Sequence, residues 1–163
     1  MPIVVSDNSP LNLLIRLRQE NVLPALFGSV VIPQEVVGEM AHPKAPGIVR
    51  DFIADIPAWL SVRSPREPKE FPTLDPGESA AIALALEMNS PLMIDERAGR
   101  DVARSHGLLV IGAVGVLERA ADIGLVADLA AVYAEVRVLR FHIDESILAA
   151  SLARHLQKSP PPK

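Results

Sequence analysis

The sequence contains no cysteine among its 163 residues. This absence excludes disulfide frameworks, thiol catalysis, and zinc or iron–sulfur sites held by cysteine, and it is typical of a protein in a reducing cytoplasm. A metal ion would therefore need oxygen or imidazole ligands. Aromatic residues are also few, at 4%, and we expect the single tryptophan, Trp59, to pack against its neighbours rather than stack on bases.

Long apolar runs are missing as well. Although 49% of the residues are hydrophobic, proline, glycine or charge interrupts every apolar stretch before the roughly 18 residues needed to cross a bilayer. The opening MPIVVSDNSPL has no basic leader before an apolar stretch, so it resembles a first strand rather than a signal peptide. We therefore expect a cytoplasmic protein that is not attached to a membrane.

The sequence also lacks an excess of basic residues, because its formal net charge is −4. This argues against a strongly basic, non-specific nucleic-acid binder. An acidic protein can still bind phosphate groups through a bound metal ion and a local basic patch. The length suits one domain, for which we predict residues 1–157, with a disordered, proline-rich tail at 158–163.

Short apolar runs alternate with helical patterns along the chain. Strands are predicted at residues 3–6, 30–32, 92–94 and 108–111, with 59–62 as a candidate fifth. Helices are predicted at 10–19, 23–27, 33–40, 48–53, 76–88, 96–106, 113–123, 127–138 and 145–157, with Ser9 capping the first. This alternation predicts an α/β fold, in which a parallel sheet of four or five strands lies between two layers of helices.

Four acidic residues occupy comparable places in this pattern. Asp7 and Asp95 follow apolar strands, Glu39 lies on the helix after the second strand, and Glu78 lies in the first turn of the helix before the third. Sites in parallel sheets form beyond the carboxyl ends of the strands, and crowded carboxylates repel one another unless a cation is present. Oxygen ligands favour Mg²⁺ or Mn²⁺, ions that activate water and stabilise a phosphoryl group in transfer.

Four blocks of sequence carry a family resemblance. In order, they are SDNSPL, VIPQEVVGEM, DPGESAAIALALE and PLMIDERAGRDVARSHGLLVIGAVGVL, and together they resemble the PIN-domain family. The resemblance covers roughly residues 1 to 125. The helical remainder is similar to one subgroup of predicted nucleic-acid-binding proteins, which resemble the toxin ribonucleases of toxin–antitoxin pairs. The sequence departs from that subgroup at Asn8 and Ala113, where threonine is usual.

The resemblance assigns roles to individual residues. It implies that Asp7, Glu39, Glu78 and Asp95 are catalytic acids and ligands of Mg²⁺ or Mn²⁺, with Glu96 as a possible substitute ligand. We expect Asn8, Ser9, Arg97 and Arg100 to contact the substrate. The two arginines repeat at helical spacing beside Asp95, although they could instead form ion pairs with Glu96 and Asp101.

The implied activity is hydrolysis of single-stranded RNA, and the implied binding partner is single-stranded or structured RNA. Metal-activated water would attack phosphorus in line, with no covalent enzyme intermediate. The resemblance also implies a homodimer and, if the protein is a toxin, a small antitoxin that blocks the site. The competing interpretation is a non-catalytic PIN-like module that binds RNA or a protein and has a weak or vestigial metal site. Phosphatase-like chemistry on small substrates is a third.

Each acid also has a purely structural interpretation. Asp7 suits a turn, and Glu39 suits a solvated helix surface. The spacing Asp75-x-x-Glu78 predicts a capping box that would satisfy helix amides without any catalysis. Asp95 suits the cap of the helix that follows it. These roles stay open at the level of the sequence.

Overall fold

A sheet of five strands lies at the centre of the computed structural model, which describes residues 2–158. The strands are β1 (Ile3–Ser6), β2 (Ser29–Ile32), β3 (Leu60–Val62), β4 (Leu92–Met93) and β5 (Val110–Ile111). All neighbours pair in parallel, in the order β3-β2-β1-β4-β5. The predicted parallel sheet is confirmed. The candidate strand at 59–62 is also present, as β3, so the sheet has five strands.

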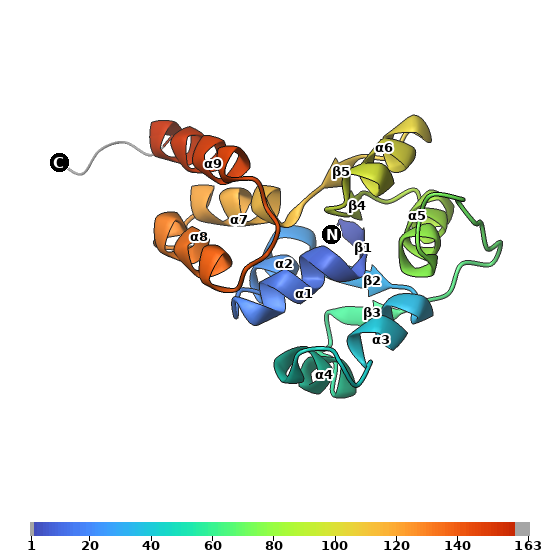
Figure 1. The fold of residues 1–163 in the computed structure, drawn as a ribbon. Coiled ribbons are helices and arrows are strands. Elements are labelled where there is room, and N and C mark those ends of the chain that lie inside the picture. Colours follow the sequence, from blue (N-terminus) through green and yellow to red (C-terminus); the bar gives the residue numbers. More distant parts are fainter. Residues whose placement is uncertain (1, 159–163) are drawn as a thin grey trace.

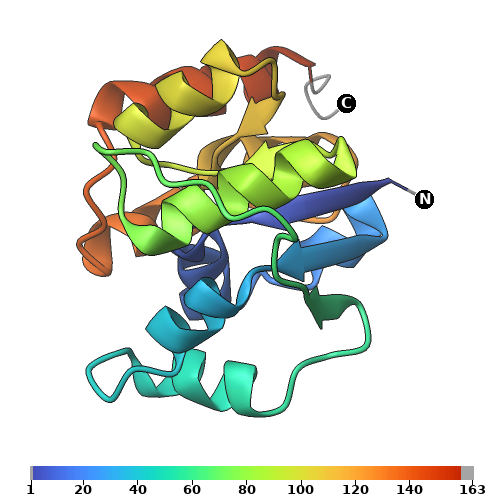
Figure 2. The same ribbon diagram turned by 90° about the vertical axis from the view of Figure 1, so that its right-hand side faces the viewer.

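Helices connect the strands and extend beyond the last one. They are α1 (Asn8–Arg16), α2 (Val22–Phe27), α3 (Gln34–Met40), α4 (Gly47–Ala54), α5 (Pro76–Met88), α6 (Arg97–Ser105), α7 (Ala113–Asp122), α8 (Leu129–Val138) and α9 (Glu145–Lys158). Helix α5 crosses one face of the sheet, while α1 lies on the other (Figures 1 and 2). Between residues 2 and 158, no helix is both long and apolar enough to pass through a bilayer.

Alternation along the strands divides the core into two parts. Val4 packs with the helices of one face, in a cluster that includes α1, α2 and α7. Its neighbour Val5 points to the opposite face and packs against α5, next to Ile82 and Leu84. Because successive side chains of a strand point to opposite faces, a sheet buried on both faces needs such continuous apolar runs. The three-layer α/β/α arrangement follows from this pattern.

Several helix ends differ from the predictions. Helix α1 begins at Asn8, with Asp7 in the N-cap position, so the prediction that Ser9 caps the helix is wrong. Pro10 is still compatible with its place, because the N–H groups of the first helical turn have no partner within the helix. Helix α9 continues to Lys158, one residue beyond the predicted domain boundary. The rest of the predicted tail, 159–163, lies outside the described residues.

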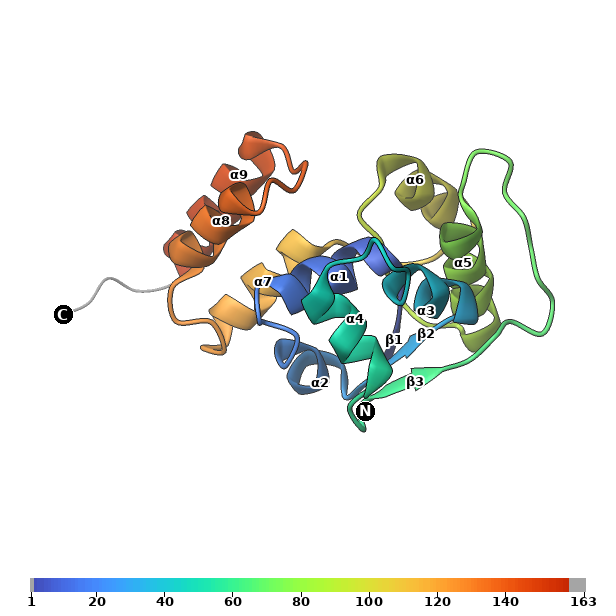
Figure 3. The ribbon, with the colours of Figure 1, turned by 60° about the horizontal axis from the view of Figure 1, so that its bottom comes forward.

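The C-terminal helices α8 and α9 lie side by side at one end of the molecule (Figure 3). A buried polar pair joins them, since the hydroxyl of Tyr133 lies 2.6 Å from that of Ser151. Helix α9 also packs along α7, where Arg154 pairs with Glu118 at 3.0 Å. These contacts hold α9 against α7, so that Ile147 and Arg154 face the same cleft as Val110 and Ile111 of β5.

Candidate active site

The carboxyl ends of the parallel strands meet at one edge of the sheet. Asp7 follows β1 directly, and Asp95 follows β4 after one further residue. These two strands are neighbours, and the backbone N–H of Asp7 donates a 2.9 Å hydrogen bond to the carbonyl of Met93. The chain leaves β1 for β2 on one side and returns later to β4 on the other, so the two aspartates flank the switch point of the sheet. Ligands of open parallel sheets bind in this place.

Asp7 is the most buried of the four acids, with 4% of its surface exposed. It occupies the N-cap position of α1, but within the described residues its side chain makes no capping bond, and its Oδ1 atom is buried without a hydrogen-bond partner. Burial raises the pKa of Asp7 to about 7, and the charges of Glu39, Asp75 and Asp95 add to this effect. A turn or capping role therefore does not account for this side chain.

The two carboxylate oxygens of Glu78 have different surroundings. The capping box is present, since Glu78 N–H donates to Asp75 Oδ1 at 2.8 Å and Glu78 Oε1 accepts from Asp75 N–H at 3.4 Å. The second oxygen, Oε2, is buried and has no hydrogen-bond partner anywhere in residues 2–158. Burial, together with the adjoining Asp75, raises the pKa of Glu78 to about 7. The structural role is real, and it leaves one oxygen free.

Glu39 reaches this edge from the last turn of α3. Its carboxylate lies against the first turn of α5, close to Gly77. Burial raises the pKa of Glu39 to about 7, as do the charges of Asp75 and Glu78, while a hydrogen bond with Asn8 opposes the shift. Glu35, one turn earlier on α3, is exposed. The structure therefore brings Glu39 to the other acids.

Asp95 lies at the boundary between the acids and a neighbouring cleft. Its Oδ1 accepts a 2.9 Å hydrogen bond from the backbone N–H of Ala113, so it caps α7 rather than α6. Burial raises the pKa of Asp95, whereas this hydrogen bond and the positive charge of Arg100 lower it. The predicted cap of the following helix is therefore wrong, because Glu96 occupies the N-cap position of α6.

The sequence reasoning missed a fifth acid of the cluster. The charge of Asp75 raises the pKa values of Asp7, Glu39 and Glu78. Its place at the start of α5 predicts a cap, and the capping box conceals its contribution to the electrostatics of the site. The available signal was its spacing, because an acid three residues before Glu78 must share the same helix end.

The chemistry of the acids suits a divalent cation, although the acids do not form a complete set of metal ligands. All of the donors are oxygens, which Mg²⁺ and Mn²⁺ prefer, and two of them, Asp7 Oδ1 and Glu78 Oε2, are buried with no partner within the described chain. In residues 2–158, however, no three carboxylate or histidine side chains are already grouped as a complete metal site. A shared ion would have to draw these side chains together.

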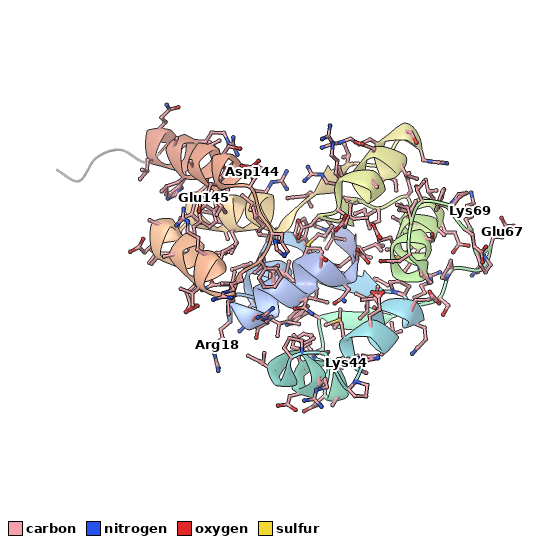
Figure 4. The ribbon with its side chains drawn as sticks, in the orientation of Figure 1. Arg18, Lys44, Glu67, Lys69, Asp144 and Glu145 are labelled. Carbon is pink, nitrogen blue, oxygen red and sulfur yellow. The ribbon has the colours of Figure 1, made fainter. Side chains whose placement is uncertain are left out.

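A cleft of about 770 Å³ opens beside Asp95. One wall comes from Arg97 and Arg100 of α6, and the other from α7, α9 and the segment 141–144 between α8 and α9. Figure 4 shows Asp144 at the start of α9. Ser9 also lines the cleft, whereas Asn8 contacts Glu39 instead. Arg119 and Arg154 line the far wall, and the sequence reasoning did not identify either of them.

Comparisons with known proteins identify one matching family and one similar structure. The family model DUF3368, described as a PIN domain, matches residues 3–157. A solved structure of a PilT N-terminus domain protein, SSO1118, from the hyperthermophilic archaeon Sulfolobus solfataricus P2 is similar, with a TM-score of 0.51 and 18% sequence identity over 71% of this chain and 90% of that chain. A search of curated proteins finds no match.

The fold and the family model agree. The match spans nearly all of the described residues, and the five-stranded parallel sheet between helices is the arrangement expected from the resemblance. PIN domains have a nuclease-like fold, are generally nucleases, and typically use divalent metal ions. The chain belongs to the DUF3368 family of PIN domains.

Proposed function

We propose that this protein is a metal-dependent endoribonuclease that hydrolyses single-stranded RNA. The observation that carries the proposal is the buried carboxylate of Asp7, which has an unpartnered oxygen at the switch point of the sheet and further acids around it. Burying such a group without a partner destabilises the fold. A divalent cation at this place would offset that cost.

The four predicted acids have distinct roles in this proposal. Asp7 and the free oxygen of Glu78 would hold the ion, and Asp95 would reach it from the side of the cleft. Glu39 would complete the ligand set or orient water. A bound Mg²⁺ or Mn²⁺ supplies charge stabilisation and an activated water, while the chain positions the ligands and the phosphate.

The cleft beside Asp95 would hold the RNA strand. An acidic pocket repels phosphates, so the strand needs cationic contacts on either side of the scissile bond. Arg97 and Arg119 are exposed on opposite walls of the cleft. Arg100 is partly buried beside Asp95 and would orient the phosphate nearest the metal ion.

The second candidate function is a non-catalytic PIN-like module that binds RNA. The observation that favours it is that no three potential metal ligands are grouped together in residues 2–158. The two functions differ in one respect, because a binding module retains RNA without cutting it at any Mn²⁺ concentration. Neither function requires the protein to be a toxin.

We expect that Asp7→Asn, Asp95→Asn and Glu78→Gln each reduce Mn²⁺-dependent RNA cleavage by about 100-fold or more, because each removes a negative ligand of the ion. Glutamine at 78 can still act in the capping box, so the third variant separates capping from chemistry. Asp51→Asn, an exposed site on α4, is the matched control. Full activity in the Asp7 variant would refute its assignment.

The raised pKa values predict how stability depends on pH. The folded state holds protons on Asp7, Glu39 and Glu78 up to about pH 7, whereas the unfolded chain releases them near pH 4. Stability without metal should therefore fall as the pH rises from about 4 to 7. We expect Asp7→Asn to melt several degrees above wild type at pH 8 in EDTA, with a smaller difference at pH 5, by differential scanning fluorimetry. A variant that melts lower at pH 8 contradicts this.

The cleft predicts a salt-dependent effect on RNA binding. In an Asp7→Asn background, Arg97→Gln and Arg119→Gln should each weaken binding of a single-stranded oligoribonucleotide and lower the slope of log K against log salt by about 0.7 per lost phosphate contact. Fluorescence anisotropy measures both quantities. Arg18→Gln is the control, since Arg18 points away from the fold (Figure 4). Equal slopes for all three variants would exclude this path for the strand.

A further inference from the structure

Three glycines lie against three of the acids. A Cβ atom added to Gly77 would fall 2.8 Å from Oε1 of Glu39 and closer still to Oε2. One added to Gly99 would fall 2.8 Å from Oε2 of Glu78. The corresponding contact at Gly112 is 2.6 Å, to Oδ1 of Asp95. Each carboxylate therefore occupies space that any other residue type would fill.

The backbone does not explain these glycines. In this fold the left-handed glycines are Gly28, Gly107 and Gly124, whereas Gly112 has φ of −95°. Gly77 and Gly99 lie in the first turns of helices α5 and α6, where alanine adopts the helical backbone as readily as glycine does. Glycine is also used where another group must approach the backbone closely, and the three carboxylates do so here.

Gly77 is the most informative of the three. Its nearest neighbours are all atoms of the Glu39 carboxyl group, whereas a side chain at Gly99 would also meet Ile94 of the core, at 2.5 Å. Glu39 is partly exposed, so its flexible end can swing aside when a methyl group is added. Substitution at 77 therefore displaces a carboxylate without disturbing the apolar core.

We propose that Gly77 is a positioning residue, whose missing side chain lets the Glu39 carboxylate lie against the first turn of α5, beside Glu78 and Asp7. The inference rests on the proposed metal-dependent function. Gly77 acts only through Glu39 and touches no reacting atom.

The test is Gly77→Ala, with Gly38→Ala as the matched control. Gly38 lies in α3 beside Glu39 and has nothing within 4 Å of an added Cβ. We expect Gly77→Ala to weaken Mn²⁺ binding, measured by isothermal titration calorimetry, about tenfold or more, in the range known for residues that orient metal ligands. Its melting temperature in EDTA should be equal to or above that of wild type. The control should bind Mn²⁺ as wild type does.

A double-mutant cycle identifies the route of the effect. In a Glu39→Gln background, Gly77→Ala should change Mn²⁺ affinity by less than twofold, because the displaced carboxylate is already absent. An undiminished tenfold loss there, or unchanged affinity in the single variant, would overturn the inference. A lower melting temperature for Gly77→Ala in EDTA would also overturn it, by showing a structural role. Failure of wild type to bind Mn²⁺ would instead overturn the proposed function and this inference together.

Discussion

The site depends on acids that repel one another yet are held together at the edge of a parallel sheet. The sheet requires this, because β1 and β4 end side by side and each is followed by an aspartate. Helix α5 runs back towards β4, so its N-terminus, with Glu78, comes to the same edge. Each acid then raises the pKa of its neighbours. Protonation of the carboxyl groups relieves this repulsion in the absence of metal. In the proposed function, a divalent cation relieves it instead.

Single residues here combine a structural role with a proposed functional one. Glu78 uses one oxygen to complete the capping box of α5 and leaves the other buried without a partner in the described chain. Asp95 caps α7 and also faces Arg100. Such sharing fixes the orientation of a carboxylate, because the bonded oxygen determines where the free one lies. This restrains each carboxylate, although a shared ion would still have to draw the side chains together.

Much of the site could be predicted from the sequence, for a physical reason. Apolar strands followed by an acid determine where that acid lies in a parallel sheet, so the positions of Asp7 and Asp95 follow from local pattern alone. Whether Glu35 or Glu39 faces the site could not be read from periodicity, since both lie on one face of α3. The far wall of the cleft could not be predicted from the sequence either, because Arg119 and Arg154 come together only through the packing of α7 with α9.

The most direct test of the account is the number of protons released when Mn²⁺ binds at pH 7. Calorimetry of the wild-type protein in buffers of different ionisation enthalpy gives this number. Carboxyl groups that hold protons near neutrality must lose them to bind a cation, so we predict net release of about one proton per ion or more. Mn²⁺ binding without proton release, or no binding at all, would contradict the claim that this cluster is a cation site.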